Sequence, residues 1–70
     1  MLKLIYIRDY KSIEFTVRDI DHAVALTNAI AESDLLNDDI DYNMFDLEYM
    51  DGNPWESDDG ESFEDYFANL

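Results

Sequence analysis

Residues 2–8, LKLIYIR, constrain the fold of this chain more than any other feature of its sequence. Apart from the basic Lys3 and Arg8, both alternating sets of side chains in this run are apolar or aromatic. That pattern is typical of a strand that is covered on both of its faces. A chain of 70 residues has room for one small hydrophobic core. We therefore expect this strand at the centre of a sheet, with a partner strand at each edge.

Two further segments, residues 13–18 and 43–50, alternate between apolar and polar side chains, as strands with one covered face do. Their apolar positions are Ile13, Phe15 and Val17 in the first segment, and Phe45, Leu47 and Tyr49 in the second. The turn signals Gly52 and Pro54 follow the second segment and end it. Both segments are predicted to be strands beside residues 2–8.

The pairing of the first two strands depends on residues 9–12 between them. This break contains no Gly and no Asn-Gly, so a two-residue turn of a primed type is not expected. The favoured register pairs Ile7 with Phe15 and sets Arg8 opposite Glu14. A shift by one residue would align Tyr6 with Phe15 instead and would lose that charge pair.

Helical periodicity marks residues 22–36 and 61–69. The apolar face of the first helix comprises Ala23, Leu26, Thr27, Ile30 and Ala31, and that of the second comprises Phe63, Tyr66, Phe67 and Leu70. Asp21 is the expected N-cap of the first helix, and Asn37 is expected just beyond its end. Asp58 and Glu61 have the spacing of a capping box for the second helix, with Asp59 as an alternative cap.

The resulting order is β-β-α-β-α in one α+β domain spanning residues 1–70. A helical crossover after the hairpin predicts an antiparallel three-stranded sheet with strand order 2-1-3. The first helix is expected on one face of the sheet, and the second on the other face or at an edge. Without cover on the second face, Leu4 and Tyr6 would be exposed and a dimer would follow. The expected state is a monomer or a homodimer.

Charge is distributed unevenly along the chain. Eighteen Asp and Glu oppose four Lys and Arg, which gives a net charge of −14. All four basic residues lie within residues 1–18, whereas residues 19–70 carry sixteen acids and no Lys or Arg. Hydrophobic residues make up 47% and aromatic residues 14% of the chain, which argues for a folded protein despite a mean hydropathy of −0.39.

This composition excludes several classes of function. Direct binding to nucleic acid or to an anionic membrane needs a positive surface, which a chain of this charge does not supply. Without cysteine there is no disulfide framework, thiol catalysis or Cys-based zinc site. No apolar run is long enough to span a bilayer, and no signal-peptide pattern opens the chain. A cytoplasmic location is therefore expected.

The many carboxylates do not form a recognisable metal or catalytic motif. Asp39, Asp41 and Asn43 match the first ligand positions of an EF-hand loop, but Met44 and Met50 occupy its required Gly and Glu positions. We therefore expect no metal site and no cofactor, and weak association of divalent cations is kept only as an alternative. His22 is expected to be a solvent-facing polar residue. The chain has no nucleophile motif, and an enzyme is not expected.

Trp55 stands out because it follows Pro54 in an acidic loop. Trp is enriched at interaction hot spots, and an acidic rim around an aromatic anchor suits a basic partner. The alternative is that Trp55 folds back and covers the edge of the sheet. The candidate partner-binding residues are Trp55, Asp38, Asp39, Asp58, Asp59, Glu61, Glu64 and Asp65.

These residues predict a non-catalytic module for protein–protein interaction or regulation, with a basic protein as partner. The alternative is a mimic of nucleic acid, in which carboxylates stand in for phosphates and occlude the basic groove of a DNA- or RNA-binding protein.

The opening MLKLIYIRDYKSIEFTV, the Ala-rich helix and the acidic, aromatic C-terminus together resemble a small family of uncharacterised proteins from streptococci and related Gram-positive bacteria. The likeness covers the length, element order and composition of the whole chain. It implies a cytoplasmic bacterial domain and assigns a role to no residue.

Overall fold

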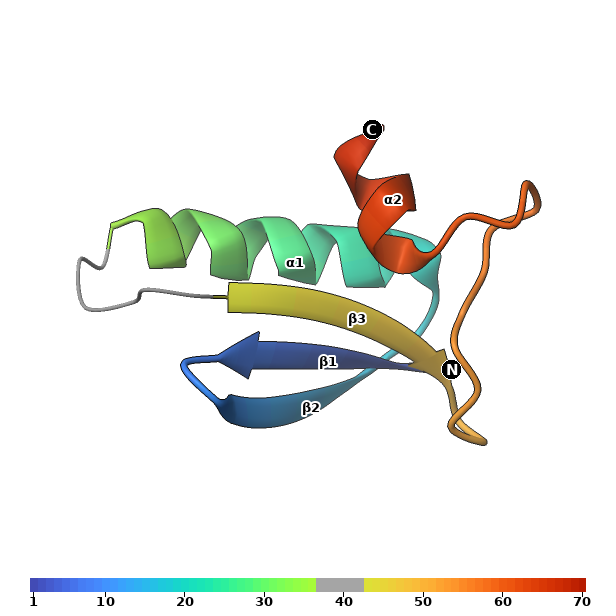
Figure 1. The fold of residues 1–70 in the computed structure, drawn as a ribbon, viewed down its shortest axis with the longest axis horizontal. Helices are drawn as coiled ribbons and strands as arrows, with labels where there is room; N and C mark the ends of the chain where they lie inside the picture. The colour runs from blue at the N-terminus through green and yellow to red at the C-terminus, as the bar shows by residue number, and fades with distance from the viewer. Residues whose placement is uncertain (37–42) are drawn as a thin grey trace.

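In a computed structural model, which describes residues 1–36 and 43–70, three strands and two helices follow one another in the predicted order (Figure 1). The elements are β1 (Leu2–Arg8), β2 (Lys11–Val17), α1 (Ile20–Leu35), β3 (Asn43–Tyr49) and α2 (Phe63–Ala68). Both β2 and β3 pair with β1 in the antiparallel sense, and the sheet order is β2-β1-β3. The predicted α+β class, the strand order and the central position of β1 are confirmed.

The β1–β2 hairpin differs from the prediction in its turn and in its register. Asp9 and Tyr10 form a two-residue turn with φ values of 48° and 71°, the backbone geometry of a primed turn. Arg8 therefore pairs with Lys11, and Ile5 rather than Arg8 lies opposite Glu14. The expected Ile7–Phe15 pairing was wrong, and so was its one-residue alternative.

The physical reason for this register is the shared face of the two strands. Leu4 pairs with Phe15 and Leu2 with Val17, so the apolar side chains of β2 join the apolar face of β1 under the helices. A primed turn matches the right-handed twist of the strands, and Asp tolerates positive φ better than most residues. The gain from burying this face outweighs the strain at the turn, although no glycine is present.

Both helices begin at caps other than the predicted ones. The Asp19 carboxylate, not that of Asp21, accepts the backbone N–H of His22 at 2.9 Å and caps α1. Ser62, not Asp58 or Asp59, caps α2 by accepting the N–H of Asp65 at 3.3 Å. The helix cannot begin earlier, because a turn at residues 57–60 and a bridge between residues 56 and 62 hold the preceding chain in a hairpin-like loop. The expected position of Asn37 lies outside the described residues.

The core lies between the sheet and the two helices, which occupy the same side of it (Figure 1). Its buried residues are Leu2, Leu4, Val17, Ala23, Leu47 and Phe63. The predicted inner face of α1 is confirmed: Ala23 and Thr27 are buried, whereas Asn28 and Glu32 point outward. On α2, Phe63 is buried, but Leu70 is 69% exposed beyond the end of the helix.

The opposite face of the sheet carries no helix in the described part of the chain (Figure 1). Of the two predicted positions for the second helix, the one at the edge is correct, because the six-residue α2 packs along β3. Leu4 and Tyr6 are nevertheless buried, at 0% and 5%, because they lie on the face that the helices cover; the expectation that they would be exposed without cover on the second face was wrong. On the open face, β1 presents Lys3, Ile5 and Ile7, which are half-buried by their neighbours in the sheet.

Candidate functional site

Residues 55–68, the second part of the segment between β3 and α2 together with α2 itself, form one end of the molecule, which we call the acidic end. It contains the carboxylates of Glu56, Asp58, Asp59, Glu61, Glu64 and Asp65. Two turns shape the segment. Asp51 accepts the N–H of Asn53 at 3.0 Å in the first, and Gly60, with a φ of 82°, donates to the Ser57 carbonyl at 2.9 Å in the second. These bonds fix the loop that carries most of the acids.

Trp55 is the anchor of this loop on the rest of the domain. Its backbone N–H donates to the carbonyl of Leu47 at 2.9 Å, so the chain folds back along the outer edge of β3. Its ring meets Tyr66 edge-on at 5.4 Å between centroids and Phe63 at 6.3 Å. Trp55 is half-buried against the core. Of the two interpretations of Trp55, this is the one in which it covers the edge of the sheet.

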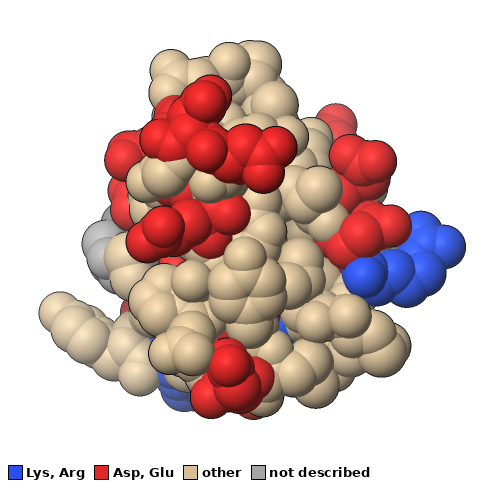
Figure 2. All heavy atoms as spheres, turned by 90° about the vertical axis from the view of Figure 1, so that its right-hand side faces the viewer, with Lys and Arg blue, Asp and Glu red and all other residues tan. Residues whose placement is uncertain are grey.

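The carboxylates of the acidic end lie in the same stretch of chain as this aromatic cluster, where Glu56 follows Trp55 and Glu64 follows Phe63. All six are exposed except Glu61, which is half-buried and accepts the side-chain amide of Asn69 at 3.1 Å. None of the six has an ion-pair partner among the described residues. Figure 2 faces this end and shows Asp and Glu gathered around an uncharged centre, with Lys and Arg toward the margins.

The structure thus brings together Trp55 and five of the predicted partner-binding acids, namely Asp58, Asp59, Glu61, Glu64 and Asp65. The other two, Asp38 and Asp39, lie outside the described residues.

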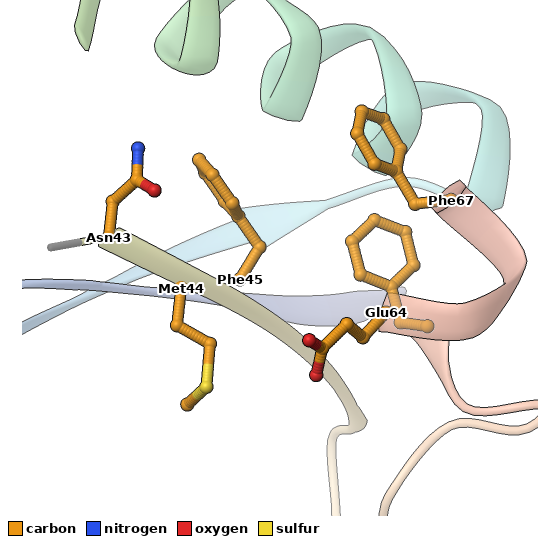
Figure 3. A pocket seen from close by; sticks show the side chains of 6 residues that line it. Asn43, Met44, Phe45, Glu64 and Phe67 are labelled. Carbon is orange, nitrogen blue, oxygen red and sulfur yellow. The ribbon is translucent and has the colours of Figure 1, made fainter.

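A shallow apolar hollow lies next to the acidic end, between β3 and α2. Three aromatic residues, Phe45, Phe63 and Phe67, line it together with Met44, and Glu64 lies at its rim (Figure 3). Its volume is about 150 Å³. Sequence periodicity indicates that all three aromatic residues belong to apolar faces. It does not indicate a gap between them, because the short α2 meets β3 at an angle that only packing determines.

A second constellation joins the C-terminal end of α1 to the sheet. The Asp34 carboxylate accepts the Tyr6 hydroxyl at 2.5 Å and the Asn43 side-chain amide at 2.8 Å. Burial opposes ionisation of Asp34, but these two bonds and the charge of Arg8 outweigh it and hold the pKa of Asp34 below its ordinary value. Burial and the bond to Asp34 raise the pKa of Tyr6. Local sequence patterns do not predict this pair, because its members are 28 residues apart.

His22, the single histidine of the chain, was expected to be solvent-facing but is half-buried. The backbone N–H of Arg18 donates to its Nδ1 at 3.0 Å. Within residues 1–36 and 43–70, no three His, Asp or Glu side chains are grouped as metal ligands would be. The EF-hand-like positions 39 and 41 lie outside these ranges.

Comparison of the chain with family models, curated proteins and solved structures found no match. The resemblance to the streptococcal family therefore stays a prediction. In the described part of the chain, no helix has both the length and the apolar character needed to cross a membrane.

Proposed function

We propose that the protein is a non-catalytic interaction module that binds a basic protein through its acidic end. The observation that supports this most is the set of six carboxylates around the Trp55 cluster, which have no counter-ion among the described residues. Like charges held together repel each other, and a basic partner would relieve that repulsion. The half-buried rings of Trp55 and Tyr66 would supply the apolar contacts that usually form the core of an interface.

The loop that presents these charges is suited to this role because it is held in place before binding. Trp55, Gly60 and Ser62 each anchor it through a backbone or capping hydrogen bond. A preorganised surface loses less conformational entropy on association than a flexible one. The acidic end would therefore favour a partner with a matching arrangement of Lys and Arg.

The test compares two variants of equal net charge. The first replaces three acids of the acidic end (D58N, D59N and E64Q), and the second replaces three exposed acids elsewhere (E14Q, D21N and E32Q). Each triple changes the net charge from −14 to −11, since three negative charges are removed. The probe is a fluorescein-labelled decalysine peptide, whose affinity is measured by anisotropy at several salt concentrations.

We expect the first triple to weaken binding by roughly tenfold, because three surface ion pairs are together worth about 1–2 kcal/mol. The second triple should change the affinity much less. Equal losses in both variants would mean that the peptide responds to net charge alone, and the acidic end would then have no special role.

Nucleic-acid mimicry, the alternative function, makes a different prediction. A mimic would displace duplex DNA from a basic DNA-binding protein, with a steep dependence on salt. Retention of the DNA at an excess of this domain would argue against mimicry and leave the interaction module in place.

A further inference from the structure

The outer edge of β3 is occupied along only part of its length. The Leu47 carbonyl accepts the N–H of Trp55, and the Tyr49 N–H donates to the Asn53 carbonyl at 2.8 Å. The N–H of Leu47 is taken by the carboxylate of its neighbour Asp46, also at 2.8 Å. From Leu47 onward, the backbone groups that point away from β1 are therefore paired by the chain's own loop and side chains.

Two residues before Leu47, at Phe45, the backbone groups on this edge are open. In an antiparallel strand, every second residue turns its N–H and C=O toward the same edge. Because the backbone N–H and C=O of Leu47 and Tyr49 point to the outer edge, those of Phe45 point there too. Among the described residues no backbone partner meets Phe45 on that side. An exposed strand edge of this kind is a template for a further strand.

The apolar hollow lies beside this open stretch. In Figure 3 the rings of Phe45 and Phe67 lie on the same side of β3, and the buried Phe63 lines the hollow with them. A guest residue opposite Phe45 would project its side chain onto the same face of the sheet, that is, toward the hollow. A volume of about 150 Å³ is that of an apolar cavity able to hold benzene, so one aliphatic or aromatic side chain fits.

Two carboxylates flank the open stretch and determine the charge of its partner. Glu64 lies at the rim of the hollow and is exposed, and Asp46 is held at the strand edge by its bond to the Leu47 N–H. A guest strand would place residues on both sides of its apolar anchor near these two charges. Lys or Arg at those positions would be favoured, and Asp or Glu would be disfavoured.

We propose that the edge of β3 at Phe45 binds an extended, basic segment of a partner protein, which adds a strand to the sheet and inserts one apolar side chain into the hollow. An extended segment is favoured over a helix because residues 53–55 of this chain already run along the same edge in that way. The inference rests on the proposed function in one respect, that the partner is basic. It adds the conformation of the partner and its anchor.

The test uses a peptide of alternating valine and threonine with lysine at both ends, titrated into the isotopically labelled domain and followed by amide NMR. The expected result is protection of the Phe45 amide from hydrogen exchange, together with shift changes at Phe63 and Phe67. A control peptide carries N-methyl groups on alternate amides, which removes the N–H donors that would face Phe45 but keeps the charge. It should bind about fivefold more weakly, since the hydrogen bond that the peptide N–H donates to the Phe45 carbonyl is lost.

A pair of charge-reversal variants tests whether Glu64, at the rim of the hollow, attracts the basic ends of the peptide. E64K should weaken binding of the peptide severalfold, whereas E32K, which carries the same change in charge on the outer face of α1, should have little effect. Equal binding of the N-methylated peptide, or shift changes centred on Ile5 and Ile7, would overturn the edge site. Equal effects of the two charge reversals would do the same.

The two proposals can fail separately. Binding of decalysine at the acidic end without binding of the valine–threonine peptide would overturn the edge site alone. Protection of Phe45 by that peptide, combined with equal effects of the two triple variants on decalysine, would support the edge site and overturn the acidic end as the docking surface.

Discussion

Replacing Thr27 by valine should stabilise this domain. Thr27 lies on the inner face of α1 and is fully buried, at 0% exposure. Its hydroxyl oxygen has no hydrogen-bond partner among the described residues. Burying an unsatisfied polar group costs about 1–3 kcal/mol relative to leaving it in water. Valine has nearly the same shape and a similar helix propensity, so T27V removes the cost without adding a new one.

The expected gain is about 1 kcal/mol, the lower end of that range. For a domain of this size, such a gain raises the melting temperature by about 4–8 °C. Thermal unfolding followed by circular dichroism, together with urea titration, measures both quantities. T16V is the matched control, because Thr16 is exposed on the open face of the sheet and its replacement should change the stability by less than about 0.5 kcal/mol.

A second variant at the same position identifies the contribution of the methyl group. T27S keeps the hydroxyl and removes the methyl, and it should destabilise the domain by about 1 kcal/mol through lost packing. If T27V lowers the melting temperature, the hydroxyl has a partner in solution, such as a helix carbonyl one turn earlier. In that case the buried hydroxyl would not be unsatisfied, and its removal would not stabilise the domain.

The remaining predictions concern pH, the hairpin turn and salt. The pKa of Asp34 is lowered in the folded state, so ionised Asp34 contributes to stability above its ordinary pKa of about 4, and this contribution is lost as the pH falls through the folded pKa. Urea titrations should show that acid lowers the stability of the wild type more than that of D34N. The pKa of Tyr6 is raised in the folded state, so its hydroxyl contributes to stability below about pH 10, and this contribution is lost as the pH rises through the folded pKa. Y6F should not show this loss of stability in the same assay. Y10G should stabilise the domain by up to about 1 kcal/mol in thermal unfolding, since glycine adopts the positive φ of Tyr10 without strain; a lower melting temperature would argue against the primed turn. Added sodium chloride should raise the melting temperature by screening the net charge of −14, and a flat response would mean that the carboxylates hardly repel one another.

The hairpin shows why some features could be predicted and others could not. The alternation of Phe15 and Val17 correctly assigned a strand and its inner face. The register depended on Asp9 and Tyr10, which adopt positive φ only because the primed turn lets both strands bury their apolar faces together. Local propensity disfavours that turn, and tertiary packing overrides it.

The candidate site shows the same division. The acids and Trp55 were predicted from composition and spacing, since their density along the chain is a local property. The apolar hollow and the open edge at Phe45 could not be predicted, because they depend on how far residues 53–55 extend along β3. The Tyr6–Asp34 bond was missed for the same reason, since sequence distance hides it.

The element types, the strand order and the segregation of charge could be predicted from periodicity and charge, which are properties of neighbouring residues. The choice of the covered face of the central strand depends on tertiary packing. Both faces of β1 are apolar, yet α1 and α2 share the side of Leu4 and Tyr6 and leave Ile5 and Ile7 on the other. A six-residue helix tied to the edge of β3 by the Trp55 loop packs on that edge, and the chain holds no other described helix to cover the second face.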